Sequence, residues 1–133
     1  MVRRKILVVS LAIGLLCAAT RAWAGKTQQG RDLYLRFCAS CHGIEGRGNG
    51  PVSRQLKVKP TDLTVLSKNN NGAFPFDQVM TSIDGTRIVG THGEAKMPVW
   101  GEVFEKYDRA KKNAKQAVIK VEIITEYIST LQR

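Results

Sequence analysis

The stretch CASCHG, residues 38–43, constrains this chain more than any other feature. Two residues separate Cys38 from Cys41, and His42 directly follows the second cysteine. The whole chain has 133 residues and three cysteines. Small exported domains usually use their cysteines as a disulfide framework, but two cysteines this close in sequence cannot staple distant parts of a fold. We therefore expect the pair to serve a local chemical purpose.

The first 24 residues have the pattern of a secretory signal peptide. Three basic residues precede an apolar run of 14 residues, 6–19, and a small-x-small site ends at Ala24. We expect a signal peptide at 1–24 and a mature domain at 25–133. The alternative is an uncleaved membrane anchor, although a spanning helix needs roughly 20 residues. A lipoprotein site at Cys17 is disfavoured because a leucine precedes it.

Cleavage would change both the charge and the cysteine count. The full sequence has 21 basic and 11 acidic residues, a net charge of +10. Residues 1–24 hold four of the basic residues and no acidic ones, so 17 and 11 remain and the net charge becomes +6. Cys17 is also lost, which leaves Cys38 and Cys41 as the cysteines of the mature chain.

The mature region has helical patterns in its first part and no period-two alternation long enough for a sheet. Residues 30–41 carry an apolar stripe at helical spacing, which predicts a first helix; the stripe is Leu33, Tyr34, Phe37 and Cys41. Residues 43–51 contain four glycines and a proline, which predicts a loop. A helix start at Pro60-Thr61-Asp62 is followed by a stop at residues 69–72.

The second part contains two further helical patterns. One starts at Pro75, places Phe76, Val79, Met80 and Ile83 at i, i+3, i+4 and i+7, and stops at Asp84-Gly85. Residues 86–101 are expected to be irregular, and residues 102–115 are rich in charge. A last helix is predicted from one apolar face with two flanking residues: Val121, Ile124, Ile128 and Leu131, beside Ile123 and Tyr127.

Four short helices and long glycine-rich loops would bury little apolar area for residues 25–133. Chains of this size are only marginally stable. A large apolar cofactor in the interior would supply the missing core. We therefore predict a small all-α domain, with about four short helices and long loops wrapped around a cofactor.

Three kinds of chemistry compete for Cys38, Cys41 and His42. A structural zinc site needs four ligands, but His92 is the sole remaining histidine and there is no second cysteine pair. A redox dithiol belongs in a thioredoxin-like βαβ context, which is absent from the pattern. C-x-x-C-H is the attachment signature of c-type haem: each thiol adds to a vinyl group and the imidazole faces the iron. Export favours the same conclusion, so we expect one covalent haem c.

The chain resembles the class I c-type cytochromes, in particular the small monohaem bacterial ones, over Gly30 to Leu131. Gly30 and Tyr34 stand eight and four residues before Cys38, where the family has a glycine and an aromatic residue. Tyr127 matches the aromatic residue of the last helix. The resemblance implies the cytochrome c fold, with the first and last helices crossing at these three residues. The glycine would allow close approach and a ring would fill the side.

The sixth ligand of the iron determines what the haem can do. His42 would be one axial ligand, and the other candidates are Met80, Met97 and His92. Met80 lies on an apolar stripe and is explained as a core residue. Met97 lies in an irregular segment next to Pro98, and the family's ligand methionine is usually followed by proline in such a loop. We therefore assign His42 and Met97 to the iron, with His92 as the alternative to Met97.

Other haem contacts are expected from three residues. The resemblance implies that the carbonyl of Pro51 accepts the Nδ1 proton of His42 and fixes the ring. Arg87 and Trp100 are candidate partners of the haem propionates. A solvated charge explains Arg87 equally well, and Trp100 is more readily explained by packing beside the haem.

The net positive charge limits the kinds of molecule that are expected to bind this protein. Two ionised propionates would lower the mature net charge to about +4. The basic residues lack interleaved aromatic residues, so nucleic acid is not an expected partner. A basic surface would steer the protein to acidic patches on redox partners. The basic run from Lys106 to Lys115 is also explained as a solvated face, and its role stays open.

These observations favour a soluble carrier of single electrons in the periplasm of a Gram-negative bacterium, without stable membrane insertion after signal cleavage. It would not be an enzyme, and would pass electrons in a respiratory chain from a donor complex or dehydrogenase to an acceptor such as a terminal oxidase. The alternatives are a tightly bound cytochrome subunit of a periplasmic oxidoreductase complex, and a haem sensor or peroxidase-like protein with a labile axial site.

Overall fold

The computed structural model describes residues 25–86, 97–110 and 116–133, and the regular structure in these ranges is entirely helical. The predicted all-α cytochrome c fold is therefore confirmed. Residues 25–37 form the N-terminal helix. The elements that follow are α2 (Ala39–His42), α3 (Phe76–Asp84), α4 (Trp100–Ala110) and α5 (Gln116–Ser129), together with three short 3-10 turns, η1 (Ser53–Gln55), η2 (Leu63–Val65) and η3 (Lys68–Asn70).

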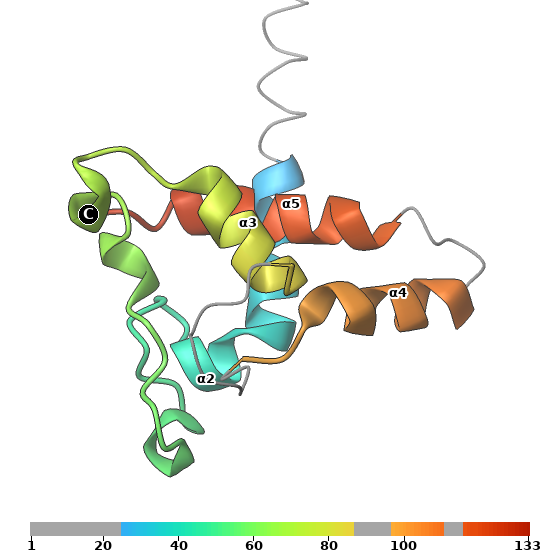
Figure 1. The fold of residues 1–133 in the computed structure, drawn as a ribbon, viewed down its shortest axis with the longest axis horizontal. Helices are drawn as coiled ribbons and strands as arrows, with labels where there is room; N and C mark the ends of the chain where they lie inside the picture. The colour runs from blue at the N-terminus through green and yellow to red at the C-terminus, as the bar shows by residue number, and fades with distance from the viewer. Residues whose placement is uncertain (1–24, 87–96, 111–115) are drawn as a thin grey trace, which may run out of the picture.

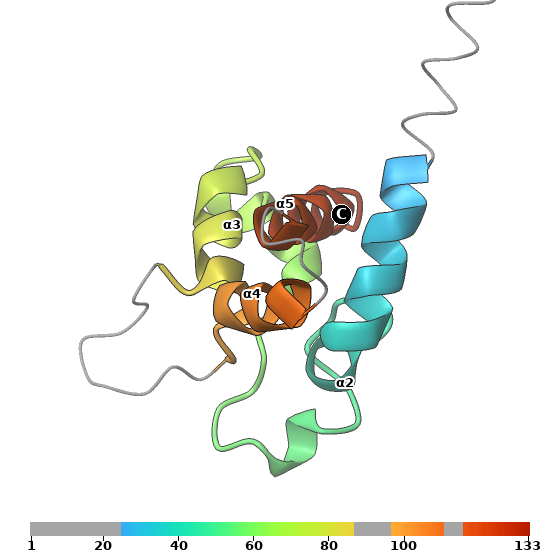
Figure 2. The same cartoon turned by 90° about the vertical axis from the view of Figure 1, so that its right-hand side faces the viewer.

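The helix α5 lies at the centre of the arrangement. It packs against both α3 and α4, and the N-terminal helix crosses it steeply (Figures 1 and 2). The loop that follows α2 extends away from the helices at the lower side of Figure 1 and returns through η2 and η3 toward the end of α5. The N-terminal helix continues through a turn at Cys38 into α2, so the crossing also fixes the position of the CASCH stretch.

The crossing of the N-terminal helix and α5 depends on Gly30. A Cβ atom at this position would lie 2.6 Å from the backbone oxygen of Ile123 and 2.8 Å from the Cβ of Tyr127, both too close for a real contact. The rings of Tyr34 and Tyr127 fill the side of the crossing, with centroids 5.4 Å apart. The predicted roles of Gly30, Tyr34 and Tyr127 are therefore confirmed.

The predicted apolar face of the last helix forms much of the core. Val121, Ile124 and Ile128 are almost fully buried, and Ile123 and Tyr127 are buried beside them. Leu131, the fourth residue of the predicted face, is partly buried against the core. From the N-terminal helix, Tyr34 joins the same cluster and is fully buried. The terminal helix thus holds the other elements together through one apolar surface.

The helix α3 follows its predicted bounds. It starts after Pro75 and ends at Gly85, which adopts a left-handed conformation with φ 87°. Ile83 is buried, and Val79 and Met80 are partly buried against the core. A glycine is favoured at such a C-terminal position because it has no Cβ to clash with the preceding turn.

Two elements differ from the sequence-based expectation. Residues 86–101 were expected to be irregular, but α4 begins at Trp100 and includes Gly101. Instead of the helix expected after Pro60, the structure has two short 3-10 turns, η2 and η3. The second turn is terminated by Asn71, which adopts a left-handed conformation with φ 54°. The turn η2 keeps residues 61–66 close to the end of α5, and this placement orients the site.

Candidate functional site

Cys38, Cys41 and His42 are held on one tight turn. The amide of Cys38 donates to the carbonyl of Tyr34 over 2.8 Å, which joins the turn to the N-terminal helix. The carbonyl of Cys38 in turn accepts from the amides of Cys41 at 3.1 Å and His42 at 2.9 Å. Neither cysteine forms a disulfide. The three reactive side chains therefore project from the same short stretch of helix.

The two thiols lie in different surroundings. Cys38 is 9% exposed and belongs to the hydrophobic core cluster, whereas Cys41 is partly exposed. Burial, with a smaller effect of Cys41, raises the pKa of the Cys38 thiol to about 12. Cys38 is therefore a neutral thiol in this environment.

His42 is oriented by a backbone carbonyl. Its Nδ1 atom lies 3.0 Å from the oxygen of Thr61. A carbonyl can only accept, so Nδ1 carries the proton and Nε2 keeps its lone pair. Burial lowers the pKa of His42, and the hydrogen bond to Thr61 opposes this lowering. The imidazole is thus neutral and presents a free nitrogen, which is the form that binds a metal.

The predicted hydrogen bond from His42 to the carbonyl of Pro51 is wrong, because His42 Nδ1 is bonded to Thr61. Pro51 is exposed, and the amides on either side of it are committed to α2: Gly50 donates to the carbonyl of Cys41 and Val52 to that of Ser40. These bonds satisfy carbonyls at the end of α2 and fix the residues on both sides of Pro51. The chain reaches the His42 ring only after the loop has returned, at Thr61.

The loop after α2 packs too tightly for a side chain at Gly50. A Cβ there would lie 2.4 Å from the carbonyl oxygen of Ser40 and 2.6 Å from that of Ala39. Further along, the amide of Leu63 donates to the carbonyl of Gly46 over 2.7 Å. The loop is therefore fastened to α2 at its start and to the segment that carries Thr61 at its return.

An apolar wall adjoins the turn. The ring of Phe37 lies 5.6 Å from that of Trp100 and 5.1 Å from that of Phe104. Trp100 packs against the core cluster, and its expected packing beside the haem stays a prediction. Its suggested contact with a propionate stays a prediction.

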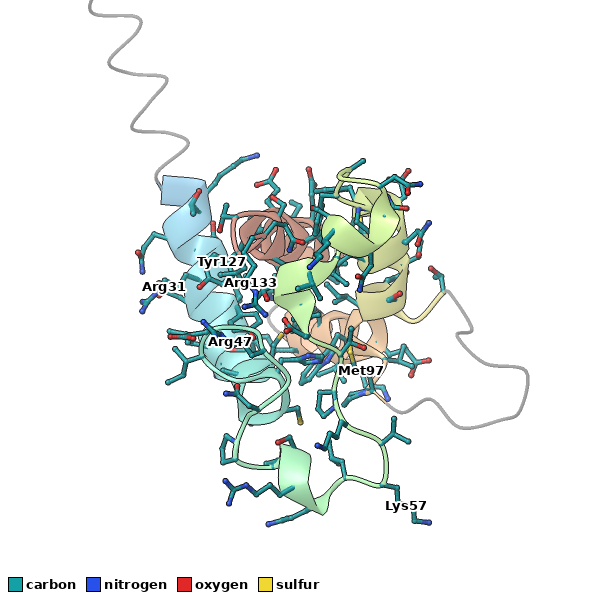
Figure 3. The ribbon with its side chains drawn as sticks, turned by 90° about the vertical axis from the view of Figure 1, so that its left-hand side faces the viewer. Arg31, Arg47, Lys57, Met97, Tyr127 and Arg133 are labelled. Atoms are coloured by element: carbon teal, nitrogen blue, oxygen red, sulfur yellow. The ribbon has the colours of Figure 1, made fainter. Side chains whose placement is uncertain are left out.

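Met97 also packs against the core cluster that contains Cys38. Figure 3 shows it near the centre of the molecule, close to the start of α4. The segment is held by the end of α3, since a Cβ at Gly101 would lie 2.7 Å from the carbonyl oxygen of Asp84. Met80 packs against the same cluster. Arg87 and His92 lie outside the described residues.

This donor set fits a covalently attached haem. Two free thiols and a neutral imidazole with a free Nε2 project from one turn, and an apolar wall stands beside them. In the part of the chain that the structure describes, no three side chains of the His, Cys, Asp or Glu type gather into a metal-binding group. No helix in residues 25–86, 97–110 or 116–133 has the length and apolar character needed to cross a membrane.

Thr61 is the site residue that sequence reasoning missed. Every residue has a backbone carbonyl, so the residue type at position 61 does not indicate that its carbonyl accepts the His42 proton. The sequence feature closest to this role is Pro60, the residue before Thr61, because a proline restricts the backbone conformation around it. The sequence pattern at Pro60 instead predicted the start of a helix.

Comparison with known families agrees with this chemistry. The family model described as cytochrome c oxidase, cbb3-type, subunit III matches residues 25–112, which is well over half of the chain. Searches of curated proteins and of solved structures gave no significant match. The matched range contains the CASCH turn, the loop behind it and Met97. The chain therefore belongs to this family of c-type cytochromes, and its cofactor is a covalently bound haem c.

Proposed function

We propose that the chain is an exported one-electron carrier whose haem iron is bound by His42 and Met97. The observation that carries the proposal is the orientation of His42: its Nδ1 proton is bound by the Thr61 carbonyl, which leaves Nε2 free beside two unpaired thiols. A ring held in this way can ligate iron without moving when the iron changes charge.

Met97 is the second axial ligand in this proposal. Its placement beside the core cluster of Cys38 supports the assignment, and the packing of Gly101 against Asp84 limits the movement of the segment that carries it. Met80 packs against the same cluster but is part of the regular helix α3. A thioether favours ferrous over ferric iron, so this ligation would raise the reduction potential.

With both axial positions occupied by protein, the iron has no open site for oxygen or peroxide. We therefore propose that the protein transfers electrons and has no catalytic reaction of its own. The protein's part is to hold the ligands, exclude water with the wall formed by Phe37, Trp100 and Phe104, and keep the His42 proton on Nδ1.

Export to the periplasm belongs to the same proposal. The expected signal peptide, 1–24, lies outside the described residues. The family match begins at residue 25, the first residue after the expected cleavage site, which supports a mature domain of 25–133. Covalent haem attachment after export is consistent with this arrangement.

The partners are proposed to be redox proteins with acidic surfaces, namely a donor complex or dehydrogenase and a terminal oxidase. The loop after α2 supports this, because its exposed side chains include Arg54, Lys57 and Lys59, and Lys57 lies at the far tip of the loop in Figure 3. A second candidate is a cytochrome subunit bound stably within an oxidase complex. The family description, which names an oxidase subunit, favours it.

The axial assignment is tested by substituting the two methionines separately in the purified holoprotein. Met97→Ala should abolish the charge-transfer absorption of a methionine-ligated ferric haem, lower the midpoint potential and allow the reduced protein to bind carbon monoxide. Met80→Ala is the matched control, because it removes the same side chain from the same core cluster, and it should leave all three properties intact. The reverse pattern, or no change in Met97→Ala, would contradict the assignment.

The choice between carrier and subunit is tested by purification from the native host in a mild detergent. A carrier should elute alone at its own size. A stable complex that contains oxidase subunits would favour the second candidate.

A further inference from the structure

The two residues Gln132 and Arg133 bind the chain segment that carries Thr61. The guanidinium of Arg133 donates from Nε to the Thr64 hydroxyl over 2.7 Å and from Nη2 to the Asp62 carboxylate over 3.1 Å. Its backbone amide donates to the carbonyl of Thr64 over 3.1 Å. Arg133 therefore contacts both the N-cap residue and the middle residue of η2, a turn that is distant from it in sequence.

Gln132 binds the same segment through its side-chain amide. Its Nε2 donates to the carbonyl of Leu63 over 2.7 Å and to that of Ile128 over 3.0 Å. Its Oε1 accepts from the amide of Ser67 over 2.9 Å. The side chain thus ties residues 63–67 to the end of α5, which is anchored in the core.

The segment itself has little regular structure of its own. Asp62 Oδ1 accepts from the amide of Thr64 at 2.9 Å and from its hydroxyl at 2.6 Å, and η2 contains only three residues. The bonds to the hydroxyl and amide of Thr64, with a smaller effect of Arg133, lower the pKa of Asp62. Asp62 is therefore ionised at neutral pH and remains a partner for the guanidinium.

The group that this arrangement positions is the carbonyl of Thr61, directly before Asp62. That carbonyl accepts the Nδ1 proton of His42 over 3.0 Å. Hydrogen bonding at Nδ1 raises the electron density on the ring and makes Nε2 a stronger donor to a metal. A stronger donor stabilises ferric iron, so the quality of this bond bears on the reduction potential.

We propose that Gln132 and Arg133 are positioning residues for the haem iron, which act through Asp62 and Thr64 on the Thr61–His42 hydrogen bond and thereby set the reduction potential. The proposal rests on His42 being an axial ligand, as in the proposed function. It does not depend on which residue is the sixth ligand.

The test uses the holoprotein with Gln132→Met and Arg133→Met combined. Two readouts are measured: the midpoint potential, and the exchange rate of the His42 Nδ1 proton in the reduced protein by NMR. Weakening the Thr61 bond should raise the potential, by up to about tenfold in the ferrous-to-ferric ratio, or about 59 mV for one electron. Exchange of the proton should quicken by about tenfold or more.

Arg47→Met is the matched control. Arg47 is an exposed arginine on the loop after α2 and is paired with Glu45 at 2.9 Å, so its substitution also removes a paired positive charge. Losing a cation alone favours ferric iron and lowers the potential, which is opposite in sign to the effect expected from the weakened bond. The control should leave proton exchange unchanged.

Unchanged exchange together with a potential shift equal to that of Arg47→Met would overturn the proposal. A loss of thermal stability without either effect would do the same, since it would show a purely structural role. If the double variant does not retain haem, the isosteric Asp62→Asn removes the charge that Arg133 contacts. Losing an anion alone also raises the potential, so in this variant the exchange rate of the His42 Nδ1 proton decides: faster exchange supports the proposal and unchanged exchange overturns it. If the unmodified reduced protein shows no iron-bound His42, the proposed function fails before any variant is compared.

Discussion

His42 meets two separate requirements of an iron-binding imidazole. Burial keeps the ring neutral by lowering its pKa, and the Thr61 carbonyl places the proton on Nδ1, so that Nε2 would be the nitrogen that binds iron. Either effect alone would leave the ring protonated or free to rotate. Together they prepare one nitrogen as a ligand and one as a fixed donor.

Substituting Cys38 and Cys41 tests whether these two side chains attach the haem. Cys38→Ser with Cys41→Ser should abolish retention of haem under denaturing conditions, because serine cannot form the thioether. The measurement is haem staining after denaturing electrophoresis. Cys17→Ser is the matched control and should keep full staining, since Cys17 lies in the expected signal peptide. Haem that stays bound to the double variant would contradict the attachment site.

The sequence predicted those site residues whose side chains carry the chemistry. Cys38, Cys41 and His42 are recognisable because thiols and imidazole in this spacing have few other uses. The Thr61 acceptor is a main-chain atom, and any residue type supplies one, so its identity depends on the path of the loop. Pro51 was assigned from resemblance, and the amides that flank it bind α2 instead.

Among the helices, α4 shows why a charged segment was not recognised as part of the fold. Phe104 is 2% exposed and Trp100 packs against the core, whereas Val103 and Tyr107 are exposed. Trp100, Phe104 and Asp108 follow one another at four-residue spacing on the helix, but the acidic third member interrupts the apolar pattern. Asp108 is only 3% exposed, although an aspartate in a sequence is normally expected at the surface. The terminal helix α5 has a continuous apolar face and was predicted.

The crossing of the N-terminal helix and α5 predicts a strong effect of a small substitution. Gly30→Ala should lower the free energy of unfolding by about 1–3 kcal/mol, because the added methyl overlaps Ile123 and Tyr127 and overpacking costs this much. The measurement is denaturant unfolding of the holoprotein. Gly25→Ala is the control: a Cβ there meets nothing within 4 Å, so stability should change by less than about 0.5 kcal/mol. Equal effects of the two substitutions would contradict the close packing.

The pairing of α4 and α5 includes a buried ion pair. Lys120 contacts the carboxylate of Asp108, and the Nζ of Lys120 lies 5.1 Å from the ring centroid of Tyr107. In the part of the chain that the structure describes, the second oxygen of Asp108 has no hydrogen-bond partner. The carboxylate therefore depends strongly on this lysine.

Removing the lysine alone should be more harmful than removing both charges. Lys120→Met should destabilise the protein by about 3–5 kcal/mol, because it leaves an uncompensated buried charge. Combining it with Asp108→Leu should restore much of that loss. Both variants are compared by denaturant unfolding of the holoprotein. A double variant less stable than Lys120→Met would contradict the prediction, because it would show that the carboxylate is not harmful once its lysine is removed.

Considered as a whole, the molecule is strongly basic, with 21 lysines and arginines against 11 acidic residues. Arg54, Lys57 and Lys59 lie on the loop that starts behind the haem-attachment turn, and Arg31 lies on the N-terminal helix, far from the loop tip (Figure 3). Steering by this loop would orient the molecule as well as attract it.

Electron exchange with charged small oxidants should reveal this field. Oxidation of the reduced protein by hexacyanoferrate(III), an anion, should slow by about tenfold or more as ionic strength rises from 0.01 M to 0.1 M. A cationic cobalt(III) complex should show the opposite trend. Lys57→Gln should reduce the salt dependence more than Arg31→Gln, which removes one positive charge far from the loop. Rates that do not respond to salt would remove the steering argument.

The enclosure of Cys38 has a consequence for the order of assembly. In the folded polypeptide this thiol is 9% exposed, and burial raises its pKa to about 12, both of which would hinder a maturation enzyme that must reach and ionise it. We therefore expect haem to be joined while the chain is still unfolded, and the domain to fold around the new bond afterwards. Folding would then act as the final, locking step of biogenesis, and a prematurely folded precursor would be a dead end.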